Sequence, residues 1–347
     1  MNFIDSSGNG KLLTIAIPTF NRCKFLDILL ESIYVQLIGE YYSVQVIIYD
    51  NNSTDSTSAV VLNWINKGLP ISYHKNATNV GPDRNIAKAF CESLSKYVWI
   101  VGDDDILLSN AIRSVIYILN NESPSLIYLK CQGFSGHFDF RKKINYNVIY
   151  NSLGKKYFLR KTNIHLTFIT AIIINREAFF ESGLGGLENF YDTHLVQLGW
   201  VLPSVYLSMP LIYVSTPIVA GRNENRSGYG QFNIFVNNFN KILLICYKNS
   251  PAWIACIRNV AIRQYYPSLL IMNNDGSWGV FEKEKYKKII VDNFKENYRY
   301  WIFLYPFFNL PVAGNKFYYL LVRVINFILR FPSSTVEKFS SKTIRCD

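Results

Sequence analysis

Residues 97–105, Tyr-Val-Trp-Ile-Val-Gly-Asp-Asp-Asp, join an apolar segment to three consecutive carboxylates. The apolar part, 97–100, has the character of a buried strand. Asp103, Asp104 and Asp105 follow where that strand would end, and neighbouring carboxylates disfavour one another's charge unless a cation lies between them. Mg²⁺ is usually held by one or two carboxylates together with substrate phosphates. The stretch therefore predicts a metal–diphosphate site, while the alternative is that Asp105 is the N-cap of a following helix.

Apolar runs that suit buried strands also occur on both sides of this stretch. On the N-terminal side they are 12–17, 44–49 and 71–74, and on the C-terminal side 125–131, 168–174 and 205–214. Between the N-terminal runs, apolar residues recur at helical spacing. The alternation of strand and helix predicts an α/β fold, in which helices flank a mixed, mostly parallel sheet.

Polar residues come after each of the first four predicted strands. They are 18–22, 50–55 and 103–105 after the first, second and fourth strands, and 81–85 in the connection that follows the third. Ligands of such sheets collect beyond the carboxyl ends of the strands. The convergence of four polar loops on one sheet edge therefore predicts a single pocket, and this supports the metal–nucleotide interpretation of the acidic run.

With these motifs in this order, the chain resembles family 2 glycosyltransferases of the GT-A fold. The resemblance covers residues 12 to 230 and is carried by TIAIPTFNR, VIIYDNNSTDST, NVGPDRN and VGDDDIL. The last two are most similar to O-antigen dideoxyhexosyltransferases, of which abequosyltransferase is the type. The resemblance implies a hexosyltransferase of lipopolysaccharide or other surface polysaccharide synthesis. Its donor would be a nucleotide-sugar, with a 3,6-dideoxyhexose carried on CDP as the example. Its acceptor would be a hydroxyl of a polyprenyl-diphosphate-linked oligosaccharide.

The resemblance also implies roles for single residues. The nucleotide-binding positions are Pro18, Thr19, Asn21, Arg22, Asp50, Asn52, Arg84, Asn85, Asp103 and Arg222. The divalent cation, Mg²⁺ or Mn²⁺, would be held by Asp104 or Asp105. Many relatives have an Asp where this chain has Gly102, so the choice between these two ligands stays open, with Asp104 favoured. Arg222 and Arg226 lie where relatives place basic residues over the diphosphate, and the alternative is that they are ordinary surface arginines.

An inverting transferase needs a base for the acceptor hydroxyl. Inverting relatives usually have an acidic pair before a helix, and the region of this chain that matches that pair is 189–194, within a predicted helix in 183–200. Either Asp192 or His194 would take the proton. The unperturbed pKa of histidine lies closer to neutral pH than that of aspartate, which suits a base. The alternative is a helix-capping Asp beside a packed imidazole. If the reaction retains configuration, neither residue acts as this base.

The C-terminal part of the chain has a different composition. Residues 231–347 are predicted to be helical, aromatic and basic, and 281–347 contain 12 Lys or Arg against 6 Asp or Glu. Aromatic residues beside basic ones suit the surface of a bilayer. The alternative is a helical subdomain that packs on the catalytic domain. We expect a catalytic domain over 1–230, with a nucleotide-binding half (1–110) and an acceptor-binding half (111–230), followed by a membrane-associating region.

The net charge of +11 favours anionic partners, so a non-catalytic basic protein that binds nucleotides or nucleic acid is the competing class. The basic residues form no recognised nucleic-acid module, and we expect no nucleic-acid partner. A methyltransferase or nucleotidyltransferase would have a glycine-rich loop after the first strand, where this chain has 18–22 instead.

The sequence also contains signals for cellular location. It has no run of 18 uncharged apolar residues and no apolar leader at its start. Its six cysteines are scattered without zinc-ligand spacing, which favours buried thiols in a reducing compartment. We therefore expect a cytoplasmic enzyme that is peripheral on the inner face of the bacterial cell membrane.

Overall fold

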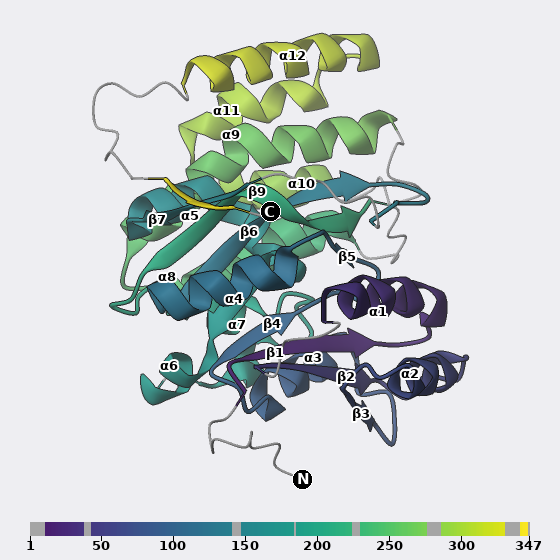
Figure 1. Ribbon diagram of the computed structural model, residues 1–347. Coiled ribbons are helices and arrows are strands. Elements are labelled where there is room, and N and C mark those ends of the chain that lie inside the picture. The colour runs from purple at the N-terminus through teal and green to yellow at the C-terminus, as the bar shows by residue number, and fades with distance from the viewer. Residues whose placement is uncertain are drawn as a thin grey trace. The chain divides into compact units, whose positions relative to one another are not determined.

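The computed structural model describes residues 11–37, 43–140, 147–183, 185–223, 230–275, 286–329 and 341–345. The chain divides into two compact units. Unit 1 comprises Met1–Lys155, Leu166–Asn225 and Ser340–Asp347, and unit 2 comprises Lys156–His165 and Arg226–Phe339. The described strands all belong to unit 1, whereas unit 2 is built of helices (Figure 1). The catalytic role of residues 1–230 and the membrane-associating role of residues 231–347 stay predictions.

Unit 1 is organised around one mixed sheet of ten strands. The strands are β1 (Leu13–Thr19), β2 (Val44–Asp50), β3 (Ile71–Lys75), β4 (Tyr97–Ile100), β5 (Ile106–Leu107), β6 (Leu126–Phe134), β7 (Val148–Leu153), β8 (Ile172–Asn175), β9 (Leu211–Arg222) and β10 (Lys342–Ile344). Their order is β10-β7-β9-β6-β8-β4-β1-β2-β3, with β5 paired to β9. The pairs β3–β2, β2–β1, β1–β4 and β6–β9 are parallel. The predicted α/β fold with a mostly parallel central sheet is confirmed.

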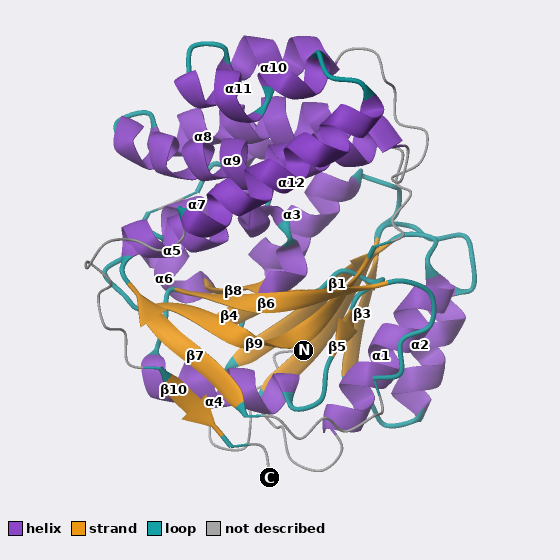
Figure 2. Cartoon of the chain, turned by 90° about the horizontal axis from the view of Figure 1, so that it is seen from above, coloured by secondary structure: helices purple, strands orange, loops and turns teal. Residues whose placement is uncertain are grey.

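Helices cover both faces of this sheet (Figure 2). One face carries α1 (Cys23–Leu37), α2 (Thr57–Asn66) and α4 (Ala111–Glu122), and the other carries α3 (Pro82–Glu92), α6 (Arg176–Glu181) and α7 (Leu198–Ser204). The helices associated with unit 2 are α5 (Lys155–Thr162), α8 (Phe239–Tyr247), α9 (Pro251–Asp275), α10 (Tyr286–Phe294), α11 (Tyr298–Phe303) and α12 (Val312–Ile328). This arrangement leaves the carboxyl ends of β1, β2 and β4 at one edge of the sheet, because these strands are parallel.

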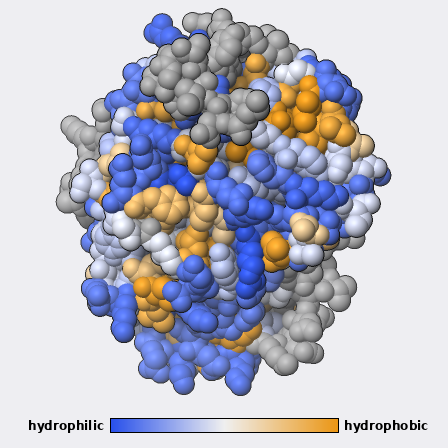
Figure 3. Space-filling view, turned by 90° about the horizontal axis from the view of Figure 1, so that it is seen from below, coloured by the Kyte–Doolittle hydropathy of each residue, from blue (hydrophilic) through white to orange (hydrophobic). Residues whose placement is uncertain are grey.

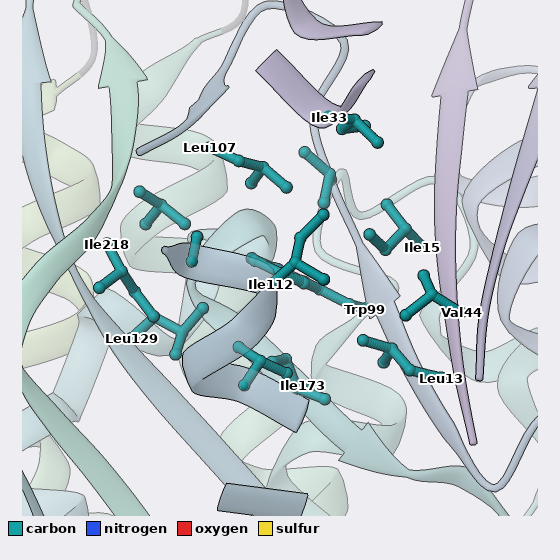
Figure 4. Packing of buried hydrophobic residues seen from close by; sticks show 14 of the residues in the cluster. Leu13, Ile15, Ile33, Val44, Trp99, Leu107, Ile112, Leu129, Ile173 and Ile218 are labelled. Atoms are coloured by element: carbon teal, nitrogen blue, oxygen red, sulfur yellow. The ribbon is translucent and has the colours of Figure 1, made fainter. Parts of the chain in front are cut away.

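The main hydrophobic core lies between the sheet and the helices α1, α2 and α4 (Figure 4). Alternate residues of β1, namely Leu13, Ile15 and Ile17, are fully buried there, as the two-residue period of a strand requires. Trp99 of β4 is also fully buried, and its indole N–H donates to the carbonyl oxygen of Thr170 at 2.8 Å. Each buried Leu or Ile contributes about 1.5–3 kcal/mol, so this core holds the strand that precedes the acidic run.

Several local expectations are wrong. Two predicted strands start too early, since β8 begins at Ile172 instead of residue 168 and β9 begins at Leu211 instead of residue 205. The predicted helix within 183–200 is absent around Asp192, which lies in a turn ahead of α7. Asp105 does not cap a helix either, because the next two residues form β5 and α4 begins only at Ala111. In each case the pairing with a distant strand or a local turn overrides the local pattern.

The surface seen from below is mostly hydrophilic, with hydrophobic residues in separate patches among the polar ones (Figure 3). The five cysteines within the described residues are free thiols, but none of them is buried, since Cys91 is exposed and the others are half-buried. The expectation of buried thiols is therefore wrong for these five. In the described part of the chain, no helix combines the length and the hydropathy needed to cross a bilayer.

Candidate active site

The polar loops that follow β1 and β2 are joined by hydrogen bonds. Thr19 and Asp50 are paired in register at the ends of these two strands. Beyond them, the backbone N–H of Asn21 donates to Ser53 Oγ at 2.9 Å, and the N–H of Thr54 donates to Asn21 Oδ1 at 2.8 Å. The predicted convergence of these loops at one sheet edge is therefore present, and Asn21 is one of the residues that hold it.

The acidic run after β4 contacts the loop after β1. Thr19 Oγ1 donates to Asp103 Oδ2 at 2.7 Å. Arg22 Nη1 lies 3.1 Å from Asp103 Oδ1 and 3.0 Å from Asp104 Oδ2, so one guanidinium nitrogen is shared by two carboxylates. Burial raises the pKa of Asp103 to about 6, against the opposing effect of the Arg22 charge. The edge of the sheet is thus a place where negative charge accumulates and a cation is stabilising.

Asp105 belongs to the same run but points into different surroundings. Its Oδ2 accepts a hydrogen bond from the Thr170 hydroxyl, and its Oδ1 accepts one from the backbone N–H of Arg222 at 3.3 Å. Only 5% of the residue is exposed, and burial together with the Asp104 charge raises its pKa to about 7. Asp104 is less buried and contacts Arg22, so the geometry favours Asp104 over Asp105 as a metal ligand.

The donor set suits a divalent ion that completes its coordination with substrate. Within the described ranges, no group of three or more His, Cys, Asp or Glu converges on one metal position. Asp103 and Asp104 nevertheless flank a single cationic nitrogen, so two carboxylate oxygens already face a common point. Mg²⁺ needs only one or two protein carboxylates when phosphates supply further oxygens. The residues therefore fit a metal that binds together with a diphosphate.

Asp50 and Asn52 form the turn after β2. Asp50 is fully buried, and its carboxylate accepts hydrogen bonds from the N–H of Ser53 at 2.7 Å and from the Tyr73 hydroxyl at 2.5 Å. Asn52 has a positive φ of 68°, which Asn tolerates better than most residues. The structure directs the Asp50 carboxylate into this loop, so its predicted contact with a base stays a prediction. Pro18, also predicted to bind the nucleotide, lies one residue before the end of β1.

An amide network fixes the loop that leads into α3. Asn51 donates to Asn79 Oδ1 at 2.8 Å and accepts from the backbone N–H of Val80 at 2.9 Å. Asn85 is buried and donates to the carbonyl oxygen of Tyr49 at 2.9 Å. The structure thus gives Asn85 an internal contact, and Arg84 is the residue of NVGPDRN whose charged group reaches outward.

The start of α3 also holds the turn that carries the two candidate bases. Asp83, only 4% exposed, accepts the backbone N–H of His194 at 2.8 Å. Arg84 Nη1 lies 3.0 Å from Asp192 Oδ1, and its guanidinium lies over the ring of Tyr191 at 4.9 Å. Asp192 and His194 both have positive φ angles, 62° and 58°, which are uncommon for residues with a Cβ. A strained turn held by a buried carboxylate thus presents the exposed side chains of Asp192 and His194.

Arg222, at the end of β9, is held at several points. Its Nη1 donates to the carbonyl oxygen of Gly136 at 3.1 Å. Its guanidinium lies 4.8 Å from the ring of Phe25 and 4.6 Å from the ring of Phe134. Its backbone N–H contacts Asp105, which places it beside the acidic run. Arg226, the second predicted arginine, lies outside the described residues.

Four residues of this site were not singled out by the sequence: Asp83, Thr170, Ser53 and Tyr73. Asp83 and Ser53 lie inside polar motifs, but nothing local distinguishes a residue that braces a loop from one that faces a ligand. Thr170 is the one hydroxyl residue in the apolar run 168–174, and this isolation is a signal that could have identified it. Tyr73 is a strand residue whose contact with the loop after β2 exists only in the folded sheet.

Residues 14–182 match the family model for glycosyl transferase family 2. Abequosyltransferase RfbV of Salmonella typhimurium is 28% identical over 240 residues, which is 62% of this chain and 68% of that protein. The GalNAc(5)-diNAcBac-PP-undecaprenol beta-1,3-glucosyltransferase of Campylobacter jejuni is 31% identical over 109 residues, or 31% of this chain and 34% of that protein.

Solved structures show the same fold. Staphylococcus aureus TarS 1–349 in complex with UDP-GlcNAc matches with a TM-score of 0.58 at 14% identity, over 82% of each chain. TarS 1–349 in complex with UDP matches with a TM-score of 0.57 at 15% identity, over 80% of this chain and 78% of that one. At such low identity these matches establish the architecture, and the donor of this chain has to be argued separately.

Proposed function

Because this chain belongs to glycosyltransferase family 2, we propose that it transfers a sugar from a nucleoside diphosphate to a hydroxyl of a lipid-linked oligosaccharide. The observation that carries this proposal is the shared cation position between Asp103 and Asp104 at the carboxyl edge of the sheet. A diphosphate donor with its counter-ion fits such an edge. The competing interpretation, a non-catalytic basic protein, is not supported by the family match.

The relatives support finer choices of substrate. Similarity to abequosyltransferase over most of that enzyme favours a 3,6-dideoxyhexose carried on CDP as the donor. The relative that is named for an undecaprenol-linked substrate favours a polyprenyl-diphosphate acceptor in O-antigen or other surface polysaccharide synthesis. Such an acceptor would bring the enzyme to the inner face of the bacterial cell membrane as a peripheral protein.

The transfer breaks the bond between the anomeric carbon and the diphosphate and forms one to the acceptor oxygen. Enzymes of this family typically use a divalent metal, which would neutralise the charge that develops on the leaving diphosphate. Asp104 would hold this metal, with Asp103 beside it. Arg22, which now bridges both carboxylates, and Arg222 would then be available to the phosphate oxygens, since guanidinium groups bind phosphate in a bidentate way.

The nucleotide would lie along the loops after β1, β2 and β4. Pro18, Thr19, Asn21 and Asn52 line these loops, and the hydrogen bonds among them order the edge in advance of binding. Preordered loops lose less conformational freedom when a ligand binds. Residues 1–110 would therefore form the nucleotide-binding half, and 111–230 the acceptor-binding half.

For an inverting reaction, the turn at Asp192 and His194 would supply the base. The ion pair with Arg84 holds the Asp192 carboxylate, whereas the His194 backbone is held by Asp83. We therefore favour His194 as the proton acceptor and Asp192 as a residue that positions the turn. His194→Gln should lower kcat with little change in KM for the donor, and Asp192→Asn should have the smaller effect on kcat. The reverse order would assign the base to Asp192.

The proposed function is tested by incubating the protein with a panel of nucleotide-sugars and Mn²⁺ and by measuring the nucleotide that is released. We expect turnover with one donor class and, in Asp104→Ala, a loss of about a hundredfold or more. Asp292→Ala, an exposed Asp to Ala change on α10, is the matched control and should leave turnover unchanged. Melting curves would show that both variants are folded. Near-normal turnover by a folded Asp104→Ala protein would refute the metal assignment.

A further inference from the structure

Helix α12 presents hydrophobic side chains to solvent. Six large ones on its outer side are between 44% and 74% exposed: Phe317, Leu320, Leu321, Val324, Phe327 and Ile328. We call these residues the apolar face of α12. They recur at spacings of three, four and seven residues and therefore share one side of the helix. Figure 1 shows α12 on the outside of α9 and α11.

The opposite side of α12 makes polar contacts inside unit 2. Asn315 and Asn326 are buried, and their side chains donate to the carbonyl oxygens of Phe307 at 3.2 Å and Arg263 at 2.5 Å. The hydroxyls of Tyr319 and Ser268 are 2.9 Å apart. A surface helix normally turns its apolar side inward. Here two amides and Val322 are inside and the six large hydrophobic residues outside, and the hydrogen bonds fix the helix in this orientation.

The charges around the apolar face indicate what covers it. Lys316 and Arg323 are seven residues apart, so they lie on the same side of the helix, at one border of the apolar face. Residues 312–329 contain no Asp or Glu. An exposed apolar patch bordered by cations, with aromatic residues within it, matches the composition of helices that lie on anionic bilayers.

From this arrangement we infer that the apolar face of α12 docks on an anionic lipid bilayer, with the helix axis parallel to the membrane surface. The helix has 17 residues and is about 25 Å long at 1.5 Å per residue, which is shorter than the hydrocarbon core of about 30 Å. The side chains of Lys316 and Arg323 would reach the lipid phosphates while the hydrophobic residues enter the headgroup boundary. This inference rests on the membrane location given under the proposed function and assigns the contact to one helix, and it does not depend on which sugar is transferred.

Co-sedimentation of the full chain with vesicles tests the inference. The vesicles consist of phosphatidylcholine, with or without phosphatidylglycerol. The wild-type chain should bind the phosphatidylglycerol vesicles. The double variant Leu320→Gln, Phe327→Gln should weaken this binding by about tenfold or more, because two side chains no longer leave water. Its matched control, Leu62→Gln, Leu94→Gln, replaces leucines that are 56% and 76% exposed on unit 1, and should bind like the wild type.

A second pair of changes tests the charges. Lys316→Gln and Arg323→Gln should each weaken binding to phosphatidylglycerol vesicles about fivefold and leave binding to phosphatidylcholine vesicles unchanged. Release of nucleotide from the donor in the absence of vesicles should be the same for all these variants. A failure of membrane docking is thereby separated from a failure of the proposed function.

Three results would overturn the inference. The first is a wild-type chain that binds neither kind of vesicle. The second is a Leu320→Gln, Phe327→Gln variant that is folded and binds as well as the wild type. The third is a wild-type chain that sediments as a dimer without lipid, while that variant sediments as a monomer. The apolar face would then be an interface between two copies of the chain.

Discussion

Asp105 illustrates, at the scale of a single residue, how burial changes the chemistry of a carboxylate. It follows Asp104 directly, yet Thr170 and the backbone of Arg222 occupy its two oxygens. The sequence showed three equivalent acids and left Asp104 and Asp105 as alternative ligands. Their environments differ because Thr170 is 65 residues away along the chain. A contact over that separation cannot be deduced from spacing.

The raised pKa of Asp105 predicts how stability depends on pH. Its pKa moves from the ordinary value of 3.8 to about 7 in the folded chain. Between these values the folded state keeps a proton that the unfolded state loses, so the free energy of unfolding falls as the pH rises through this window. One such group contributes a slope of about 1.4 kcal/mol per pH unit. Asp105→Asn should make the free energy of unfolding depend less steeply on pH, as measured by urea unfolding at a series of pH values in metal-free buffer.

Asp103 has a pKa raised in the same direction, so some pH dependence should remain in the Asp105→Asn variant. The control is Asp292→Asn, which changes an exposed carboxylate and should keep the slope of the wild type. Parallel unfolding profiles of the wild type and the Asp105→Asn variant would show that Asp105 is ionised in the folded chain. The short acidic run would then need another cation near it.

Individual elements show where local patterns suffice and where they do not. The strands β1 to β4 were predicted within two residues of their ends, because apolar runs bounded by polar loops describe such parallel strands well. The two-residue strand β5 was not predicted, since it is too short to show a pattern. The turn at Asp192 was predicted as helix. Its two positive φ angles are maintained by Asp83 from α3, so the conformation is imposed by a contact with a different element.

The connection between β4 and β5 depends on Gly102. A Cβ at this position would lie 2.9 Å from Asp105 Oδ2 and 3.4 Å from Thr170 Oγ1. Gly102→Ala should therefore push the carboxylate out of place and lower the free energy of unfolding by about 1–3 kcal/mol. The matched control is Gly185→Ala, where a Cβ would meet nothing within 4 Å.

Urea unfolding followed by tryptophan fluorescence measures both glycine variants. An unchanged midpoint for Gly102→Ala would mean that Asp105 and Thr170 shift without cost. A larger side chain and the Thr170–Asp105 hydrogen bond compete for the same space.

On the scale of the whole molecule, the chain leaves the sheet, builds unit 2 and returns to the sheet at its end. β10 pairs antiparallel with β7, and Lys342 Nζ lies 2.6 Å from Glu122 Oε1. The sequence pattern predicts a separate helical region over everything after residue 230. A three-residue strand has too little pattern to reveal that the last residues belong to unit 1.

This return predicts that a change near the C-terminus affects the stability of unit 1. Ile344 is 6% exposed and belongs to the main core of the sheet. Ile344→Ala should lower the free energy of unfolding by about 2 kcal/mol, since a buried aliphatic side chain is removed. Thr343→Ala, which changes an exposed residue of the same strand, should have a much smaller effect in the same urea titration. Equal effects of the two changes would place β10 outside the core.

The position of β10 also bears on how membrane docking should be tested. A deletion of residues 300–347 would remove α12 together with a strand of unit 1. Loss of vesicle binding in such a truncation would then have two explanations. The paired substitutions on the apolar face of α12 avoid this problem, because they leave β10 in place.

The sequence by itself indicated the resemblance to family 2 glycosyltransferases, the alternation of strands and helices, and the sheet edge at which polar loops gather. These features depend on local periodicity and on short motifs, and both are properties of neighbouring residues. Only the tertiary structure separated Asp104 from Asp105, paired Arg84 with Asp192, and turned the hydrophobic side of α12 outward. Each of these depends on contacts between residues far apart in the chain, and local patterns carry no record of such contacts.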